Sequence, residues 1–215
     1  MVATQNFLSE RVQNLAESET LKMARMAREL RAQGHDVISL SLGEPDFDTP
    51  DHIKEAAYQA LKDGYTKYTP VAGLPELVKA ISEKFKRDNQ LEYRPDQIVV
   101  SNGAKQSVYN ICQALLDPGD EVVVFAPYWV SYVEIIKLSG GTPIPIYAGV
   151  ERDFKPIFLQ LEEAITDRTK FVLFSSPCNP TGTVFTSSEL EAYAKVMGRH
   201  ERVLVVSGEI YEHIN

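Results

Sequence analysis

DPGDEVVVFAPYWVSY, residues 117–132, places a turn, a short apolar run and an aromatic loop in direct succession. The turn Asp117–Asp120 leads into Glu121–Phe125, which is apolar after its first residue and shows no alternation with polar residues. Such runs are typical of strands whose two faces are both covered by helices. This stretch therefore predicts a buried strand that ends in a loop able to carry binding groups.

The same pattern recurs on both sides of this stretch, with short β-rich runs alternating with helical patterns. A last helix is predicted to open at Ser187 or Ser188, with Glu191 placed for a capping box. Strands that are each followed by a helix indicate an α/β fold with a mostly parallel sheet covered by helices. The predicted strands are Gln97–Ser101, Glu121–Phe125, Thr142–Tyr147, Phe171–Phe174 and Val203–Val206.

The first ninety or so residues differ, because helical patterns dominate them. One helix is expected over Thr20–Ala32, before Gly34, one from Thr49-Pro50 to Gly64, and one from Pro75. Proline at a helix start and glycine just after its end are the residues expected at those positions. Between the helices lie two loops rich in turn residues, GEPDFDTP (43–50) and YTPVAGLP (68–75).

Composition excludes several classes of protein. Of the 215 residues, 44% are hydrophobic, and 22 Lys and Arg against 30 Asp and Glu give a net charge of −8. This acidity argues against a nucleic-acid or anionic-membrane partner. Cys112 and Cys178 are too few for a disulfide framework and lack zinc-ligand spacing, so we expect no metal site and a reducing compartment. Because no apolar run has signal-peptide or membrane-spanning length, we expect a cytoplasmic protein.

Three loops could carry binding groups. SNGAKQ (101–106) joins a predicted strand to a helix, whose unpaired first amides suit a phosphate, although a plain connection is the alternative. SPCNPTG (176–182) holds the amide of Asn179 between two prolines. APYWVSY (126–132) contains Trp129, which could stack on a flat ring or lie in the core. Because all three follow parallel strands, we expect them to converge at one edge of the sheet.

Six motifs together resemble a known family over nearly the whole chain. They are GEPDFDTP, YTPVAG, SNGAKQ, DPGDEVVVFAPYWVSY, SPCNPTG and SGEIYEHI, in this order. The chain resembles the N-terminal half of a class I, fold-type I, pyridoxal-phosphate-dependent aminotransferase, with most likeness to bacterial aspartate aminotransferases. The resemblance implies that residues 1–45 are an N-terminal arm and helix belonging to the small domain. Residues 46–215 would be the N-terminal part of the cofactor-binding large domain, truncated before its last strands.

The resemblance also assigns the phosphate and the ring of the cofactor. Gly103, Ala104 and Lys105 would hold the phosphate, mainly through backbone donors. Trp129 would stack on the pyridine ring. Asn179 would then contact the cofactor as well.

Further roles follow from the same resemblance. Asn179 and Tyr211 would both form hydrogen bonds with the phenolic oxygen of the cofactor, and Tyr68 would reach the phosphate in a neighbouring subunit. Gly43 would lie near the carboxylate of the substrate, with Trp129 and Asn179 also in contact with it. The implied assembly is a homodimer.

Two departures from the family pattern stand out. The family's chains are much longer than 215 residues, and the lysine that forms the Schiff base belongs to their second half, so we assign no catalytic residue here. The aspartate that should face the pyridine nitrogen falls on Gly208. Cys178, where asparagine is usual, is a smaller change that we expect to be tolerated. Gln97–Ser101 should lack its sheet neighbours, and we expect a fragment that is less stable than the intact enzyme.

The sequence thus predicts an aminotransferase that exchanges an amino group between an amino acid, aspartate or a similar one, and a 2-oxo acid. The chain by itself is expected to be inactive. Two alternatives remain open. One is a non-catalytic remnant that binds a ligand or pairs with an aminotransferase subunit. The other is a pyridoxal-phosphate-dependent carbon–sulfur lyase, because such enzymes share this first half.

Overall fold

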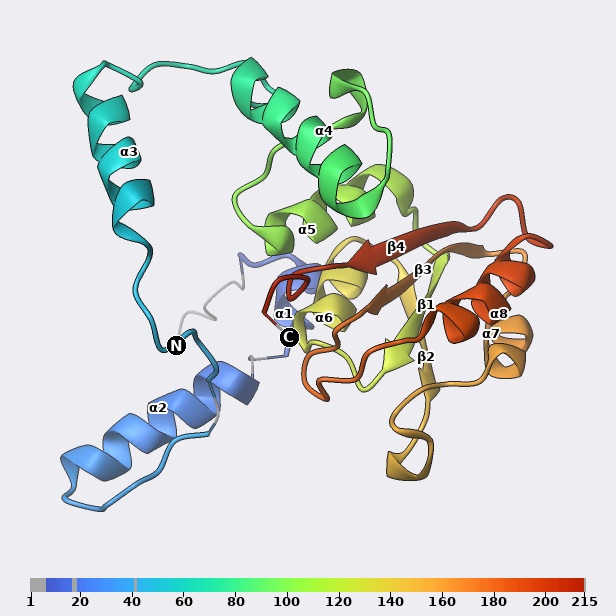
Figure 1. The fold of residues 1–215 in the computed structure, drawn as a ribbon. Coiled ribbons are helices and arrows are strands. Elements are labelled where there is room, and N and C mark those ends of the chain that lie inside the picture. The colour runs from blue at the N-terminus through green and yellow to red at the C-terminus, as the bar shows by residue number, and fades with distance from the viewer. Residues whose placement is uncertain (1–6, 17–18, 41, 215) are drawn as a thin grey trace. The chain divides into compact units, whose positions relative to one another are not determined.

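A computed structural model describes residues 7–16, 19–40 and 42–214 (Figure 1). The chain divides into two compact units. One unit comprises Met1–Glu19 and Gly103–Asn215, and the other comprises Thr20–Asn102. The assignment of residues 1–45 and 46–215 to two different domains stays a prediction.

The larger unit is built on a parallel four-stranded sheet in the order β2-β1-β3-β4. In the register of the sheet, Val123 of the central strand lies opposite Ile144 on one side and Val172 on the other. The predicted mostly parallel sheet is confirmed, with four of the five predicted strands. They are β1 (Glu121–Ala126), β2 (Thr142–Tyr147), β3 (Thr169–Ser175) and β4 (Leu204–Gly208).

Helices cover both faces of this sheet, so its central strand is buried throughout (Figure 1). Successive side chains of a strand point to opposite faces. Val122 and Val124 accordingly belong to one apolar cluster, and Val123 and Phe125 belong to a second. The first cluster includes residues of α5 (Ala104–Leu115) and α6 (Ser131–Leu138). The second includes residues of α7 (Phe158–Ala164) and α8 (Ser187–Met197). Each buried aliphatic or aromatic side chain contributes about 1.5–3 kcal/mol.

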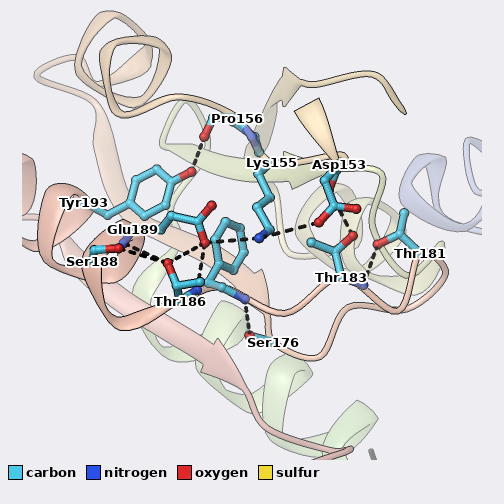
Figure 2. A network of polar contacts seen from close by, with 11 residues as sticks. Asp153, Lys155, Pro156, Ser176, Thr181, Thr183, Thr186, Ser188, Glu189 and Tyr193 are labelled. Atoms are coloured by element: carbon cyan, nitrogen blue, oxygen red, sulfur yellow. Dashed lines mark hydrogen bonds and ion pairs between the residues drawn. The ribbon is translucent and has the colours of Figure 1, made fainter. Parts of the chain in front are cut away.

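The predicted start of α8 at Ser187 is confirmed, but the predicted capping box is wrong. Its N-cap is Thr186, whose hydroxyl accepts a hydrogen bond from the Glu189 amide, while the Glu189 carboxylate accepts one from the Thr186 amide. Glu189, and not Glu191, therefore completes the capping box. Figure 2 shows that the same carboxylate also meets the ammonium group of Lys155, at 3.1 Å. The α6 helix begins at Ser131.

The second unit is helical, as predicted. The left-handed φ angles of Gly34 (89°) and Gly64 (84°) end the first two helices, and Pro75 is the first residue of the third. These helices are α2 (Glu19–Ala32), α3 (Asp51–Lys62) and α4 (Pro75–Asn89). Within the described residues, the remaining short helical segments are α1 (Glu10–Gln13), η1 (Pro95–Gln97) and η2 (Val150–Arg152).

The prediction of a strand at Gln97–Ser101 is wrong. Gln97 ends the η1 turn, and Ile98–Ser101 continues without joining any strand of the described residues. Instead the amide of Val100 donates to the carbonyl of Ala72 at 2.9 Å. An extended segment becomes a strand only when a neighbour pairs with its backbone groups. The segment was also expected to lack sheet neighbours, and among the described residues no strand pairs with it.

Candidate functional site

The site candidate lies at the carboxyl ends of β1, β3 and β4, where two of the three loops predicted to converge, residues 126–132 and 176–182, meet the segment that follows β4. The thiol of Cys178, after β3, donates to the carbonyl of Pro127, after β1, at 3.4 Å. The side-chain amide of Asn179 donates to the hydroxyl oxygen of Tyr211, after β4, at 3.1 Å. Two hydrogen bonds thus tie the three loops to one another at a single edge of the sheet.

The loop that carries Asn179 is closed on itself by its backbone. The amide of Cys178 donates to the carbonyl of Thr183 at 3.0 Å, and the amide of Gly182 donates to the carbonyl of Cys178 at 2.7 Å. Gly182 has a φ of 72°, a conformation that favours glycine. This bonding fixes the backbone around Asn179 before any ligand binds, which lowers the entropy cost of presenting its amide.

The start of α5 offers backbone donors to a ligand. Gly103 is the N-cap, with a φ of 79°, and no atom lies within 4 Å of the point where a Cβ would stand. The amides of Ala104 and Lys105 follow it in the first turn, where an amide has no acceptor within its own helix. The helix dipole adds partial positive charge at this end. An open, glycine-led helix start of this kind fits a phosphate group.

Lys105 connects this helix start to the loop after β1. Its ammonium nitrogen lies 5.0 Å from the centroid of the Trp129 ring, within the range of a cation–π contact. Trp129 in turn meets the ring of Tyr132 edge to face, with centroids 5.5 Å apart. Trp129 is half-buried at the margin of the first apolar cluster, so part of its ring is open to a ligand.

Gly208 and Tyr132 form a close contact that the sequence did not reveal. Gly208 ends β4 and pairs with Ser175 of β3. A Cβ at Gly208 would stand 2.7 Å from the hydroxyl oxygen of Tyr132 and 3.3 Å from the Cβ of Ser175. The place where the resemblance expects a carboxylate therefore lies against a phenol. The only signal for Tyr132 in the sequence is its place three residues after Trp129, in the same aromatic loop motif.

Burial sets the protonation of this phenol. Tyr132 is buried, and desolvation raises the pKa of its hydroxyl, which the hydrogen-bonding contact with Ser175 partly opposes. Burial also raises the pKa of Tyr128. Both phenols are therefore neutral at physiological pH, because the ordinary pKa of tyrosine is 10.0 and their values lie above it.

Two of the predicted site residues, Gly43 and Tyr68, belong to the other compact unit. The Tyr68 side chain is fully exposed, in the loop between α3 and α4. No atom lies within 4 Å of the position of a Cβ at Gly43. Their proposed contacts with substrate and with a neighbouring subunit stay predictions. Among the helices of the described residues, none combines the length and the apolar character needed to cross a bilayer.

Comparison with known proteins identifies the family. The profile of aminotransferase class I and II matches residues 35–214. The chain is 52% identical over 208 residues to the aspartate/prephenate aminotransferase of Cereibacter sphaeroides, covering 97% of this chain and 52% of that protein. It is also 52% identical, over 207 residues, to the aspartate aminotransferase of Bacillus sp. strain YM-2, covering 96% of this chain and 53% of that protein.

Solved structures agree in fold. The aspartate aminotransferase of Rhizobium meliloti superposes with a TM-score of 0.93 at 43% identity, covering 96% of this chain and 52% of that one. The Thermus thermophilus aspartate aminotransferase with maleate gives a TM-score of 0.92 at 48% identity, with 97% and 55% covered. The predicted aspartate aminotransferase fold is confirmed, and the chain spans about half the length of the relatives it matches. The chain belongs to the class I and II aminotransferase family.

Proposed function

We propose that this chain is part of an aminotransferase that moves an amino group between an amino acid and a 2-oxo acid, with aspartate or a similar acid as donor. The observation that carries the proposal is the junction of three loops at one sheet edge, bonded through Cys178 and Asn179. The names of the relatives support the aspartate preference. The Thermus thermophilus structure contains maleate, a four-carbon dicarboxylate, which supports a substrate with two acidic groups.

Members of this family use pyridoxal phosphate, and the residues at the site fit that cofactor. The amides of Ala104 and Lys105 would hold the phosphate at the start of α5. The Lys105 ammonium, held above the indole of Trp129, adds a positive charge beside that position. Trp129 offers a flat, partly open ring for stacking.

The Asn179–Tyr211 pair would hold the phenolic oxygen of the cofactor. Asn179 donates to the Tyr211 hydroxyl oxygen, so the phenol proton is free to point at a ligand oxygen. The second amide hydrogen of Asn179 is a further donor to the same place. When bound, pyridoxal phosphate supplies an electron sink for the carbanion formed at the α-carbon of the amino acid. These residues would bind and orient it.

The resemblance places the Schiff-base lysine in the half of the relatives that these 215 residues do not span. We therefore propose that the chain alone binds cofactor without transaminating, and that the intact protein works as a homodimer in the cytoplasm. Tyr68, fully exposed in its loop, would serve the neighbouring subunit. Analytical ultracentrifugation with and without pyridoxal phosphate measures the association.

Titration of pyridoxal phosphate against the fluorescence of Trp129 tests the proposal directly. Trp129 is the only tryptophan, so every change in indole emission reports on this site. We expect saturable quenching, weakened by inorganic phosphate as competitor. A matched control is Trp129→Phe, which removes the signal, combined with detection of binding by cofactor absorbance. Absence of saturable binding would contradict the proposal that the chain binds the cofactor. Turnover of aspartate and 2-oxoglutarate by the 215-residue chain would contradict the proposal that it does not transaminate alone.

One observation favours a second candidate, a non-catalytic ligand-binding protein. Gly208 stands where the family's carboxylate is expected, and no side chain there can support a positive charge on the ligand ring. Tight binding of pyridoxal phosphate by the intact protein, without transamination of any amino acid offered, would favour this candidate.

A further inference from the structure

The side chain of residue 208 would project onto the face of the sheet that α5 and α6 cover. Strand residues two apart share a face, so position 208 lies on the same face as Val206. Val206 packs against the apolar cluster that contains Tyr132. Tyr132 itself lies in the first turn of α6, and only 6% of its surface is exposed.

Close approach, and not backbone conformation, requires glycine at this position. The φ angle of Gly208 lies outside the left-handed region that other residues avoid. A Cβ, however, would stand 2.7 Å from the Tyr132 hydroxyl oxygen, nearer than real Cβ atoms come to other atoms. It would also stand 3.3 Å from Ser175 Cβ and 3.6 Å from the Phe174 carbonyl oxygen. Two of these three neighbours belong to the adjacent strand, so the tyrosine is the one that has to move.

We propose that Tyr132 takes the place of the side chain at position 208, so that this end of the site presents a neutral phenol to a bound ligand where a carboxylate would otherwise stand. The part that concerns the ligand rests on the proposed function. A carboxylate next to a pyridine nitrogen favours its protonated form. A phenol donates its proton in a hydrogen bond and leaves the nitrogen neutral.

Burial supports this role for the phenol. Desolvation raises the pKa of Tyr132, and the titratable groups Cys178 and Tyr211 raise it further, whereas Ser175 lowers it. Tyr132 therefore keeps its proton and cannot replace the negative charge of a carboxylate. With such a neighbour the ring nitrogen of a bound cofactor would be neutral, which would weaken the electron sink that transamination requires.

A double-mutant cycle in stability tests the contact without any ligand. We expect Gly208→Ala to lower the folding equilibrium constant by about 5- to 30-fold, the effect of a one- to two-kilocalorie clash. In the Tyr132→Phe background, which lacks the hydroxyl, the same substitution should lower the folding equilibrium constant much less. Gly198→Ala is the matched control for glycine, because its added Cβ meets nothing nearer than 3.4 Å. Tyr128→Phe is the control for the loss of a tyrosine hydroxyl.

The ligand part is tested with pyridoxine 5′-phosphate, a probe that needs no lysine for binding. Nitrogen NMR of the isotope-labelled probe at neutral pH separates neutral pyridine from pyridinium. We expect a neutral ring nitrogen with the natural chain and a protonated one with the double variant Gly208→Asp, Tyr132→Phe, in which the Cβ of residue 208 no longer meets the Tyr132 hydroxyl. Trp129 quenching confirms that both proteins bind the probe.

The outcomes separate the two ideas. If Gly208→Ala lowered the folding equilibrium constant equally in the natural chain and in the Tyr132→Phe background, the proposed contact between position 208 and Tyr132 would be refuted. Pyridinium bound to the natural chain would overturn the role of the phenol toward the ligand. Absence of binding by both proteins would overturn the proposed function and with it the ligand part of this inference, while the stability cycle would still decide whether Tyr132 fills the position.

Discussion

The side-chain amide of Asn179 donates a hydrogen bond to the hydroxyl oxygen of Tyr211 across 3.1 Å. The two residues follow different strands, β3 and β4, so this bond joins two loops of the site. Both side chains are partly buried, which shields the bond from competing water. The pair therefore holds its geometry before a ligand arrives.

Asn179→Ala and Tyr211→Phe should each weaken binding of pyridoxine 5′-phosphate by about fivefold, since one hydrogen bond is worth about 1 kcal/mol and about 1.4 kcal/mol corresponds to tenfold. Because the residues contact one another, the double variant should lose less than the sum of the two single effects. Titration by Trp129 fluorescence measures all four proteins. Additive losses would show that the two side chains act independently.

Glu121 should make stability depend on acid. Its carboxylate is buried at the amino end of β1 and accepts hydrogen bonds from the Thr166 hydroxyl at 2.6 Å and the Arg168 guanidinium at 2.9 Å. These two partners hold the pKa of Glu121 below its ordinary value of 4.5. A lowered folded-state pKa gives stability that is present above 4.5 and is lost as pH falls through the folded value.

Glu121→Gln should therefore lower the free energy of unfolding at neutral pH by about 1–3 kcal/mol and flatten its fall below the ordinary glutamate pKa. Urea denaturation at a series of pH values measures both effects. Glu191→Gln, an exposed carboxylate on α8, is the control and should leave the profile unchanged. If the free energy of unfolding of Glu121→Gln fell at low pH as it does in the natural chain, groups other than Glu121 would determine that fall.

Thr186→Ala should destabilise α8 by about 1 kcal/mol, because it removes the hydroxyl that caps the Glu189 amide. The loss also loosens Glu189, whose carboxylate holds Lys155 in a site where only 16% of the lysine side chain is exposed (Figure 2). Thr186→Ser keeps the hydroxyl and should retain most of the stability. Urea melts compare the three proteins, and equal midpoints for Ala and Ser would count against the cap.

Leu161→Ala and Ile136→Ala compare the two faces of the sheet. Both side chains are almost completely buried, at 1% and 0% exposure, and each truncation should cost about 2–5 kcal/mol. Ile136 lies in the cluster that Trp129 packs against, whereas Leu161 lies in the other cluster. Only Ile136→Ala should also weaken binding of the probe. A similar loss of affinity in Leu161→Ala would contradict the separation.

Much of the fold could be predicted because its strands are short apolar runs, a pattern typical of buried strands. The predicted strand Thr142–Tyr147 has the observed bounds, and Glu121–Phe125 differs from β1 by one residue. Gln97–Ser101 has the same local character, but pairing depends on partners elsewhere in the chain, which a local pattern does not contain. The cap of α8 was missed because hydroxyl residues occupy three successive positions, 186–188, each a suitable N-cap.

The site could be predicted as far as the residues that follow the strands, since parallel strands end at a common edge. The contact between Tyr132 and Gly208 could not, because it depends on the tilt of α6 against β4 and on the length of one side chain. The sequence shows only that position 208 lacks a carboxylate. Which side chain occupies the space beside position 208 depends on how the folded chain packs.

The division of the core into two clusters has a practical side. Val123 and Phe125 belong to the cluster that does not contain Tyr132 or Trp129, and the strand backbone stands between them and Val122 and Val124. Volume-conserving changes beneath α7 and α8 thus leave the cluster against which Trp129 packs unaltered in composition. Stabilising substitutions, spectroscopic labels and neutral sequence changes should therefore disturb ligand recognition least when they are placed in this second cluster.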